Sequence, residues 1–140
     1  MSLVFDRAFA APYGEAVRLS PLIRRVLANN PGPFTFRGTG TYIVGARDVA
    51  VIDPGPDIPE HVDALKRALT GCRVTHILIT HTHADHSPAA RPLQEWSGAT
   101  TYGFGPHPIA HVESQALQNL SVAQLLPDIV HRQQNVPGGH

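Results

Sequence analysis

The sequence has 140 residues, of which 42% are hydrophobic and 16% are charged, and this composition is typical of one globular domain with a buried core. Eleven basic and eleven acidic residues give a formal net charge of zero, so the net charge does not indicate a polyanionic partner. The single cysteine, Cys72, excludes an internal disulfide and suits a reducing compartment. The sequence has no signal-peptide pattern and no apolar run of membrane-spanning length, so we expect a cytoplasmic protein without a membrane contact.

The first part of the chain alternates short apolar segments with turn formers. Such alternation predicts strands that are separated by turns. The predicted strands lie at residues 17–19, 22–27, 42–44 and 49–52. Asn29 to Pro33 predicts a turn, and Gly45 to Asp48 predicts the tight connection of a hairpin.

A helix is predicted between Asp57 and Gly71. Asp57 and Glu60 have the spacing of a capping box at its start. Its apolar face is formed at helical period by Ile58, Val62, Leu65 and Leu69. The helix would join the strand at 49–52 to a β-branched, apolar run from Val74 to Thr80. The result is a β-α-β unit whose two parallel strands end at the same edge of a sheet.

Three histidines and an aspartate lie within six residues, His81-Thr82-His83-Ala84-Asp85-His86, directly after this second strand. Alternate side chains of an extended segment point the same way, so His81 and His83 can converge on one ion. Asp85 and His86 can then reach a second ion. Neutral imidazole and carboxylate are ligands that zinc accepts in sites kept open for water, so the run predicts a metal site.

Other polar residues have weaker signals. Asp53 follows the strand at 49–52 and would lie at the same edge as His81. Its carboxylate either orients the metal loop by hydrogen bonding or belongs to an ordinary turn aspartate. The remaining candidates are interpreted as core or surface residues without chemistry: Cys72, His61, His76, His107, His111 and His131.

A second helix is predicted after the metal loop. Ser87 suits its amino-terminal cap, Pro88 its first position and Gly98 its end. Pro92 would lie one turn inside this helix, where a proline is expected to distort it. The further elements predicted downstream are a strand at residues 100–104 and a helix at residues 113–126.

The pattern His-x-His-x-Asp-His after a buried strand resembles the metal motif of the metallo-β-lactamase superfamily. Gly40 to Gly45 resembles the early hairpin of that family, and Val49 to Pro56 resembles its Asp-x-Gly turn beside the site. The resemblance runs from about Pro33 to Thr101. The continuation from His86 to Ala90 most resembles the β-lactamase-like protein 2 and glyoxalase-II-like branches.

The resemblance implies an α/β (α+β) fold, the metallo-β-lactamase-like α-β-β-α sandwich, here truncated to its first half. Residues 1–140 would then be a single domain that is incomplete at the carboxyl end. Members of the family carry a third histidine, a bridging aspartate and a last histidine further downstream, and His140 is only a weak candidate for the third histidine. A half sandwich would leave one apolar sheet face uncovered, which favours a homodimer.

The resemblance also implies a hydrolase with one or two Zn²⁺ ions, or another divalent metal. His81 and His83 would hold the first ion, and Asp85 and His86 the second. The metal would lower the pKa of bound water and polarise the scissile bond, while Asp85, as the catalytic residue, would position the hydroxide. The implied substrate is a small-molecule ester, thioester, lactone or β-lactam, or the phosphodiester of an RNA.

Two other interpretations stay open. The chain could be a non-catalytic, truncated metal-binding fragment or pseudoenzyme that acts by association, because its ligand set is incomplete. It could also be a different metal enzyme, since amidohydrolase barrels and histidine-triad hydrolases use His-x-His as well. Both of these lack the Asp-His pair, and a chain of 140 residues is too short for a barrel.

Overall fold

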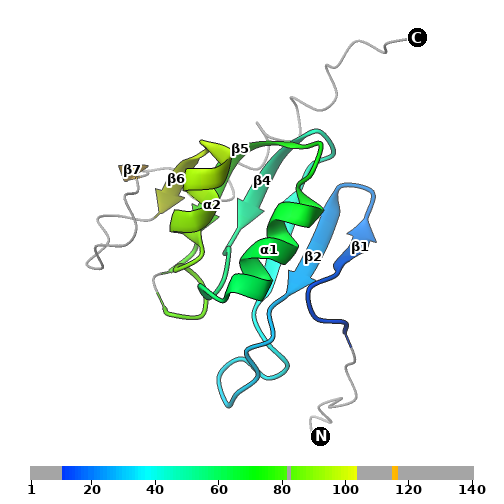
Figure 1. Cartoon of the computed structure of the whole chain (residues 1–140), viewed down its shortest axis with the longest axis vertical. Helices are drawn as coiled ribbons and strands as arrows, with labels where there is room; N and C mark the ends of the chain where they lie inside the picture. Colours follow the sequence, from blue (N-terminus) through cyan, green and yellow to red (C-terminus); the bar gives the residue numbers. More distant parts are fainter. Residues whose placement is uncertain (1–10, 82, 104–114, 117–140) are drawn as a thin grey trace, which may run out of the picture.

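The computed structural model describes residues 11–81, 83–103 and 115–116. They form a mixed seven-stranded sheet, with two helices in the described part of the chain (Figure 1). The elements in chain order are β1 (Ala16–Ser20), β2 (Ile23–Leu27), β3 (Gly40–Val44), β4 (Asp48–Ile52), α1 (Pro59–Ala68), β5 (Arg73–Ile79), α2 (Ala90–Ser97), β6 (Thr100–Gly103) and β7 (Gln115–Ala116). The strands lie in the sheet in their sequence order.

The sheet changes from antiparallel to parallel at β4. Strands β1 to β4 pair antiparallel; short turns join β1 to β2 and β3 to β4, and a longer loop over residues 28–39 joins β2 to β3. β4, β5, β6 and β7 pair parallel, and helices provide the crossovers from β4 to β5 and from β5 to β6. The predicted hairpin and the predicted β-α-β unit are both confirmed, and the carboxyl ends of β4 and β5 lie side by side.

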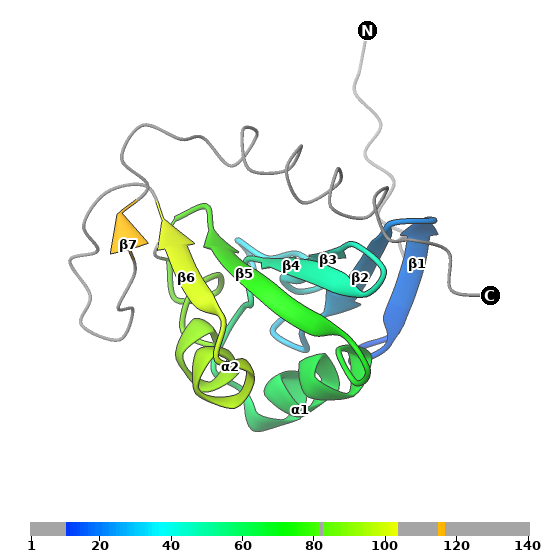
Figure 2. The same ribbon diagram turned by 90° about the horizontal axis from the view of Figure 1, so that it is seen from above.

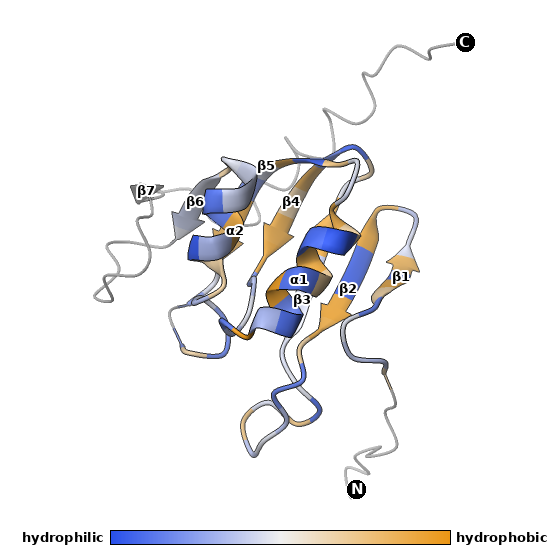
Figure 3. Ribbon diagram, in the orientation of Figure 1, coloured by the Kyte–Doolittle hydropathy of each residue, from blue (hydrophilic) through white to orange (hydrophobic). Residues whose placement is uncertain are grey.

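Both helices pack on one face of the sheet (Figure 2). The strands beneath them are mostly apolar, whereas the helices turn polar residues outward (Figure 3). Val49 and Val51 of β4 join the buried cluster that includes Leu65 of α1 and Leu93 of α2, and Cys72 packs against this cluster as expected. Burial of each such aliphatic side chain contributes about 1.5–3 kcal/mol to the stability of the fold. The packing of the helices therefore stabilises the sheet, including the edge that carries the loops.

The opposite face of the sheet carries the alternate residues. Ala50 and Leu78 are fully buried there and pack with Ile52 and Tyr102, as the period of two along a strand requires. The ring of His76 stacks on that of Tyr102 at 5.1 Å. No helix of the described residues lies on this face, and the homodimer predicted through it stays a prediction.

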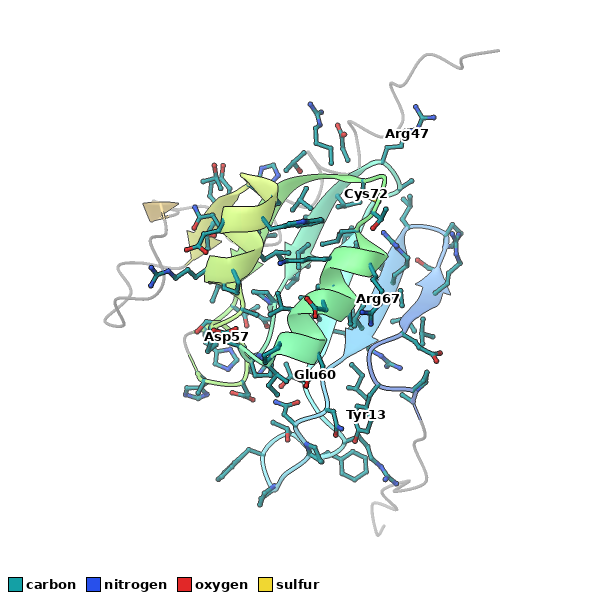
Figure 4. All side chains as sticks on the ribbon, in the orientation of Figure 1. Tyr13, Arg47, Asp57, Glu60, Arg67 and Cys72 are labelled. Atoms are coloured by element: carbon teal, nitrogen blue, oxygen red, sulfur yellow. The ribbon has the colours of Figure 1, made fainter. Side chains whose placement is uncertain are left out.

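The start of α1 differs from the prediction. The helix begins at Pro59, and its N-cap residue is Ile58, which makes no side-chain capping bond. Asp57 lies on the turn before the helix and Glu60 in its first turn (Figure 4), so the predicted capping box is wrong. Pro59 starts the helix instead, because its φ is already helical and its missing N–H needs no partner at that position.

α2 begins later than predicted. It starts at Ala90, with Ala89 as N-cap residue, so the assignment of Ser87 and Pro88 to the cap and first position is wrong. Pro92 therefore falls in the first turn, where a proline removes no helical hydrogen bond, and the expected distortion is absent from this continuous helix. Gly98 ends the helix in the left-handed conformation, with φ of 72°, as predicted.

The last predicted elements are only partly covered. β6 confirms the strand predicted at 100–104 up to Gly103. Gln115 and Ala116 form strand β7 beside β6, so a helix beginning at Glu113 is wrong for these two residues. The rest of that predicted helix and His140 lie outside the described residues.

Candidate metal centre

Two loops meet at the carboxyl edge of the parallel strands. The metal loop follows β5, and the turn that begins at Asp53 follows β4. Backbone hydrogen bonds join them, from Gly55 N–H to the His86 carbonyl at 2.9 Å and from Ala89 N–H to the Gly55 carbonyl at 2.9 Å. Ala89, the N-cap residue of α2, thus ties the start of that helix to the turn after β4.

Asp53 lies at the base of the metal loop and is only 8% exposed. Its backbone has φ of 49°, a conformation that costs energy for any residue with a Cβ. Its carboxylate accepts hydrogen bonds from Thr80 N–H at 2.8 Å, from the Thr80 hydroxyl at 2.6 Å and from His86 Nδ1 at 3.2 Å. The strained turn is therefore held by contacts to the loop that it supports.

The four predicted ligands come together at this edge. The ring centroid of His81 lies 4.6 Å from that of His83 and 4.1 Å from that of His86. Asp85 Oδ2 lies 3.1 Å from His86 Nε2. His81 and His83 are exposed, and Asp85 and His86 are half-buried, so an ion could reach the site from solvent.

Two overlapping groups of donor atoms could each hold one ion. His81, His83 and Asp85 offer ligand atoms that lie within 4.8 Å of one another, and so do Asp53, His81 and His86. Nitrogen and oxygen donors of this kind fit zinc and similar divalent ions. His81 belongs to both groups, so it is the donor on which the whole set depends.

A buried histidine supports the Asp53 turn from below. His61 is 3% exposed, and its Nε2 lies 2.9 Å from the Pro54 carbonyl and 3.2 Å from the Thr41 hydroxyl. Burial lowers the pKa of His61, partly offset by the hydrogen bond to Pro54, so its ring is neutral near pH 7 and donates from Nε2 to the carbonyl. The Thr41 hydroxyl in turn donates to the Asp53 carbonyl at 2.8 Å.

An open hollow of about 780 Å³ lies over the metal loop. The loop contributes His81, His83, Ala84, Asp85 and His86 to its lining, and Asn30, Phe34, Thr35 and Pro56 contribute the rest. Phe34 is 99% exposed, which is unusual for a large apolar side chain on a structured loop. The predicted ligands therefore lie at one wall of a cavity large enough for a small organic molecule.

The loop that carries Phe34 is held in a defined shape. Asn30 Oδ1 accepts from Thr39 N–H at 2.8 Å, and Asn30 Nδ2 donates to the Thr39 hydroxyl at 3.0 Å. The Thr35 hydroxyl donates to the Asn30 carbonyl at 2.6 Å. These bonds close the loop at its base, so the exposed ring of Phe34 is held beside the hollow.

Sequence reasoning missed Thr80, His61 and Asn30 at this site. The sequence predicts Thr80 only as the end of a strand, and His61 only as a core or surface residue without chemistry. Their partners Asp53, Pro54 and Thr39 were not identifiable, because a hydrogen bond between distant positions leaves no periodic signal.

None of the helices in the described part of the chain has the length and apolar character of a membrane-spanning segment.

Known proteins resemble this chain over the same region. Residues 35–136 match the family model of the metallo-β-lactamase superfamily. An atrochrysone carboxyl ACP thioesterase of Aspergillus terreus is 47% identical over 76 residues, which cover 52% of this chain and 24% of that protein. A beta-lactamase-like protein 2 homolog of Caenorhabditis elegans is 42% identical over 73 residues, which cover 49% of this chain and 25% of that protein. The matched segments thus span about a quarter of the length of these relatives.

Among solved structures, ETHE1 from Myxococcus xanthus aligns with a TM-score of 0.49 and 29% identity, covering 67% of this chain and 40% of that one. The family match, in contrast, takes in more than half of this chain and includes the metal loop and the β-α-β unit. The mixed sheet with its helices on one face is the part of the α-β-β-α sandwich that the resemblance implied. The chain belongs to the metallo-β-lactamase superfamily.

Proposed function

We propose that this chain supplies the metal-binding loop of a zinc-dependent thioester hydrolase. The observation that carries the proposal is the convergence of His81, His83, Asp85 and His86 at the wall of the open hollow. Hydrolysis is the general activity of the superfamily to which the chain belongs, and its relatives include named thioesterases. Zinc and the thioester are the specific parts of the proposal.

The donor set supports a divalent metal of the zinc type. His81 and His83 with Asp85 would hold one ion, and His86 would take part in holding a second. A bound ion would lower the pKa of a water molecule and polarise the scissile carbonyl. Asp85, half-buried beside His86, would accept a hydrogen bond from the attacking water and so orient it. Asp53 would keep the loop in place from beneath.

The walls of the hollow favour a substrate with an apolar arm. Its lining includes the apolar side chains of Phe34 and Pro56 together with the polar metal loop. A thioester with a long or aromatic acyl group matches both kinds of lining, because its carbonyl would face the loop and its acyl group Phe34. A lactone or β-lactam that lacks an apolar substituent would use the loop but would leave the exposed ring of Phe34 without an apolar partner.

The first test is metal content per chain, measured by elemental mass spectrometry after removal of loosely bound metal. The wild-type protein is expected to hold one or two zinc ions. His81→Ala should lose most of this metal, because His81 belongs to both donor groups. His83→Ala should keep part of it, since His81, Asp85 and His86 remain.

His76→Ala is the matched control for loss of a histidine. Its ring stacks on Tyr102 away from the donor groups, so it should keep the wild-type metal content. If His81→Ala held as much zinc as the wild type, the proposed site would be wrong. Protein that holds zinc is then assayed for thiol release from acyl thioesters of increasing chain length.

Metal binding without hydrolysis is the second candidate. The described donors form only groups of three, whereas the family resemblance implies further ligands downstream. Zinc bound at wild-type level with no thiol released from any ester of the series would favour this candidate. The cytoplasmic location and the homodimer remain predictions in either case.

A further inference from the structure

Two of the proposed ligands are linked to the same carboxylate, His81 through a hydroxyl group and His86 directly. His81 Nδ1 lies 2.9 Å from Thr80 Oγ1, and Thr80 Oγ1 lies 2.6 Å from Asp53 Oδ2. His86 Nδ1 lies 3.2 Å from the same Asp53 oxygen. The hydrogen-bonded chain therefore runs from His81 through Thr80 and Asp53 to His86.

The positions of the protons in this chain follow from its chemistry. An ionised carboxylate only accepts hydrogen bonds, so the single hydroxyl proton of Thr80 is donated to Asp53. The Thr80 oxygen can then act only as an acceptor toward His81, which must carry its proton on Nδ1. His86 likewise donates from Nδ1 to Asp53. With its proton on Nδ1, a neutral His81 ring has the Nε2 lone pair free for a metal ion, whereas Nε2 of His86 faces Asp85 Oδ2 at 3.1 Å.

We infer that Thr80 is a positioning residue that selects the metal-binding tautomer of His81. Its hydroxyl passes the orienting effect of Asp53 on to His81, whereas the hydrogen bonds of the Asp53 carboxylate itself go to Thr80 and His86. The inference rests on the proposed metal site for its function, although the tautomer itself is a property of the metal-free chain. Partners of this kind fix ring orientation and raise the basicity of the ligand.

The same contacts argue that Asp53 orients ligands rather than binding the ion. Asp53 Oδ1 already accepts from Thr80 N–H, and Oδ2 accepts from two further donors. Asp53 is also buried, whereas His81 and His83 are exposed beside the hollow. A metal bound to Asp53 would have to displace these bonds, so the donor group that contains Asp53 is the weaker of the two.

The test compares Thr80→Val with Thr80→Ser. Valine has nearly the shape of threonine but no hydroxyl, and serine restores the hydroxyl without the methyl group. Thr75→Val is the matched control, because Thr75 lies on β5, the strand that Thr80 follows, and its hydroxyl donates to the Val49 carbonyl, away from the metal loop. All variants are labelled with ¹⁵N and studied without metal, at a pH where histidine is neutral.

The first readout is the tautomer of His81, from long-range ¹H–¹⁵N spectra of the ring. The wild type, Thr80→Ser and Thr75→Val should show the proton on Nδ1. Thr80→Val should shift His81 toward the Nε2–H form, while His86 keeps its proton on Nδ1 because its own bond to Asp53 remains. A wild-type His81 that carries its proton on Nε2 would overturn the inference.

The second readout is zinc affinity, measured by competition with a chromophoric chelator. Thr80→Val should bind zinc roughly 10-fold more weakly than the wild type, at the low end of what loss of such a partner costs. Thr80→Ser should bind within about twofold of the wild type if the hydroxyl alone carries the effect. Equal affinity of Thr80→Val and wild type would overturn the inference and leave the metal site standing.

The two readouts separate failure of this inference from failure of the proposed function. If His81 shows the expected tautomers but no variant binds zinc, the proposed function fails, and with it the role of Thr80 toward a metal. If zinc binds and the tautomer of His81 does not respond to Thr80→Val, the function stands and the inference fails.

Discussion

At the scale of single residues, the site depends on close backbone approach. Gly55 has φ of +90°, and a Cβ placed there would lie 2.8 Å from His61 Nε2 and 3.4 Å from the Thr41 hydroxyl. Any other residue would have both a strained backbone and a clash with a buried ring. Gly55 also forms both backbone bonds that join its turn to the metal loop, so this strain would reach the site.

Gly55→Ala should therefore be more destabilising than Gly71→Ala. Gly71 has a similar φ of +80°, but a Cβ there would meet nothing within 4 Å, so the variant has only the backbone cost of about 1–2 kcal/mol. Gly55→Ala adds displacement of His61, for a total of roughly 2–4 kcal/mol. Urea unfolding of the two variants measures the difference. Equal losses would mean that His61 moves aside freely.

At the scale of elements, the β2–β3 loop and the metal loop both contribute residues to the lining of the hollow. The first loop is closed by the bonds of Asn30 to Thr39, so the position of Phe34 does not rely on packing. A ring that is 99% exposed contributes almost nothing to the stability of the fold. Its contribution, under the proposed function, is to bind the acyl group of the substrate.

Phe34→Ala should raise KM for long-chain acyl thioesters several-fold, because a partly buried ring contact with the substrate is worth about 1–2 kcal/mol. Metal content and the unfolding midpoint should stay at the wild-type values. Phe36→Ala is the matched control, since Phe36 lies on the same loop but not in the lining of the hollow. An unchanged KM for Phe34→Ala at every chain length would exclude this contact.

At the scale of the whole molecule, stability is linked to pH through His61. Its pKa in the folded state is lowered by burial, so the unfolded chain binds the proton more tightly than the folded one. Stability is then fully present above the ordinary pKa of histidine, near 6.5, and falls as the pH drops below it. This pH dependence is a property of the whole molecule, because the buried His61 ring takes up a proton more readily once α1 leaves the sheet or the site opens.

His61→Gln should flatten this dependence. Glutamine can keep a donor near the Pro54 carbonyl but takes up no proton in this range. Urea unfolding of metal-free protein at pH 7.5 and pH 5.5 should show a smaller loss of stability for the variant than for the wild type. The difference between the two proteins isolates His61, because the other histidines are common to both. A parallel loss in both would contradict the lowered pKa.

The sequence alone determined the elements and the chemical class of the site. The apolar periods around Leu65 and Ile77 predicted a helix and a strand, and the spacing from His81 to His86 predicted metal ligands. These signals are local, since a period of two or 3.6 and a six-residue motif are read from neighbouring positions. The errors at the starts of both helices are also local, because a few competing hydrogen bonds decide which residue caps a helix.

Only the tertiary structure decided how those ligands are held. Asp53 meets Thr80 across 27 positions and His86 across 33. Asn30 closes its loop on Thr39, and Ala89, before the start of α2 at Ala90, bonds to Gly55. Such contacts arise when strands β4 and β5 are placed side by side, and hydrogen bonds between distant residues have no period in the chain. The sequence therefore predicted which residues are candidate metal ligands, and the fold determined which distant residues hold those side chains in place.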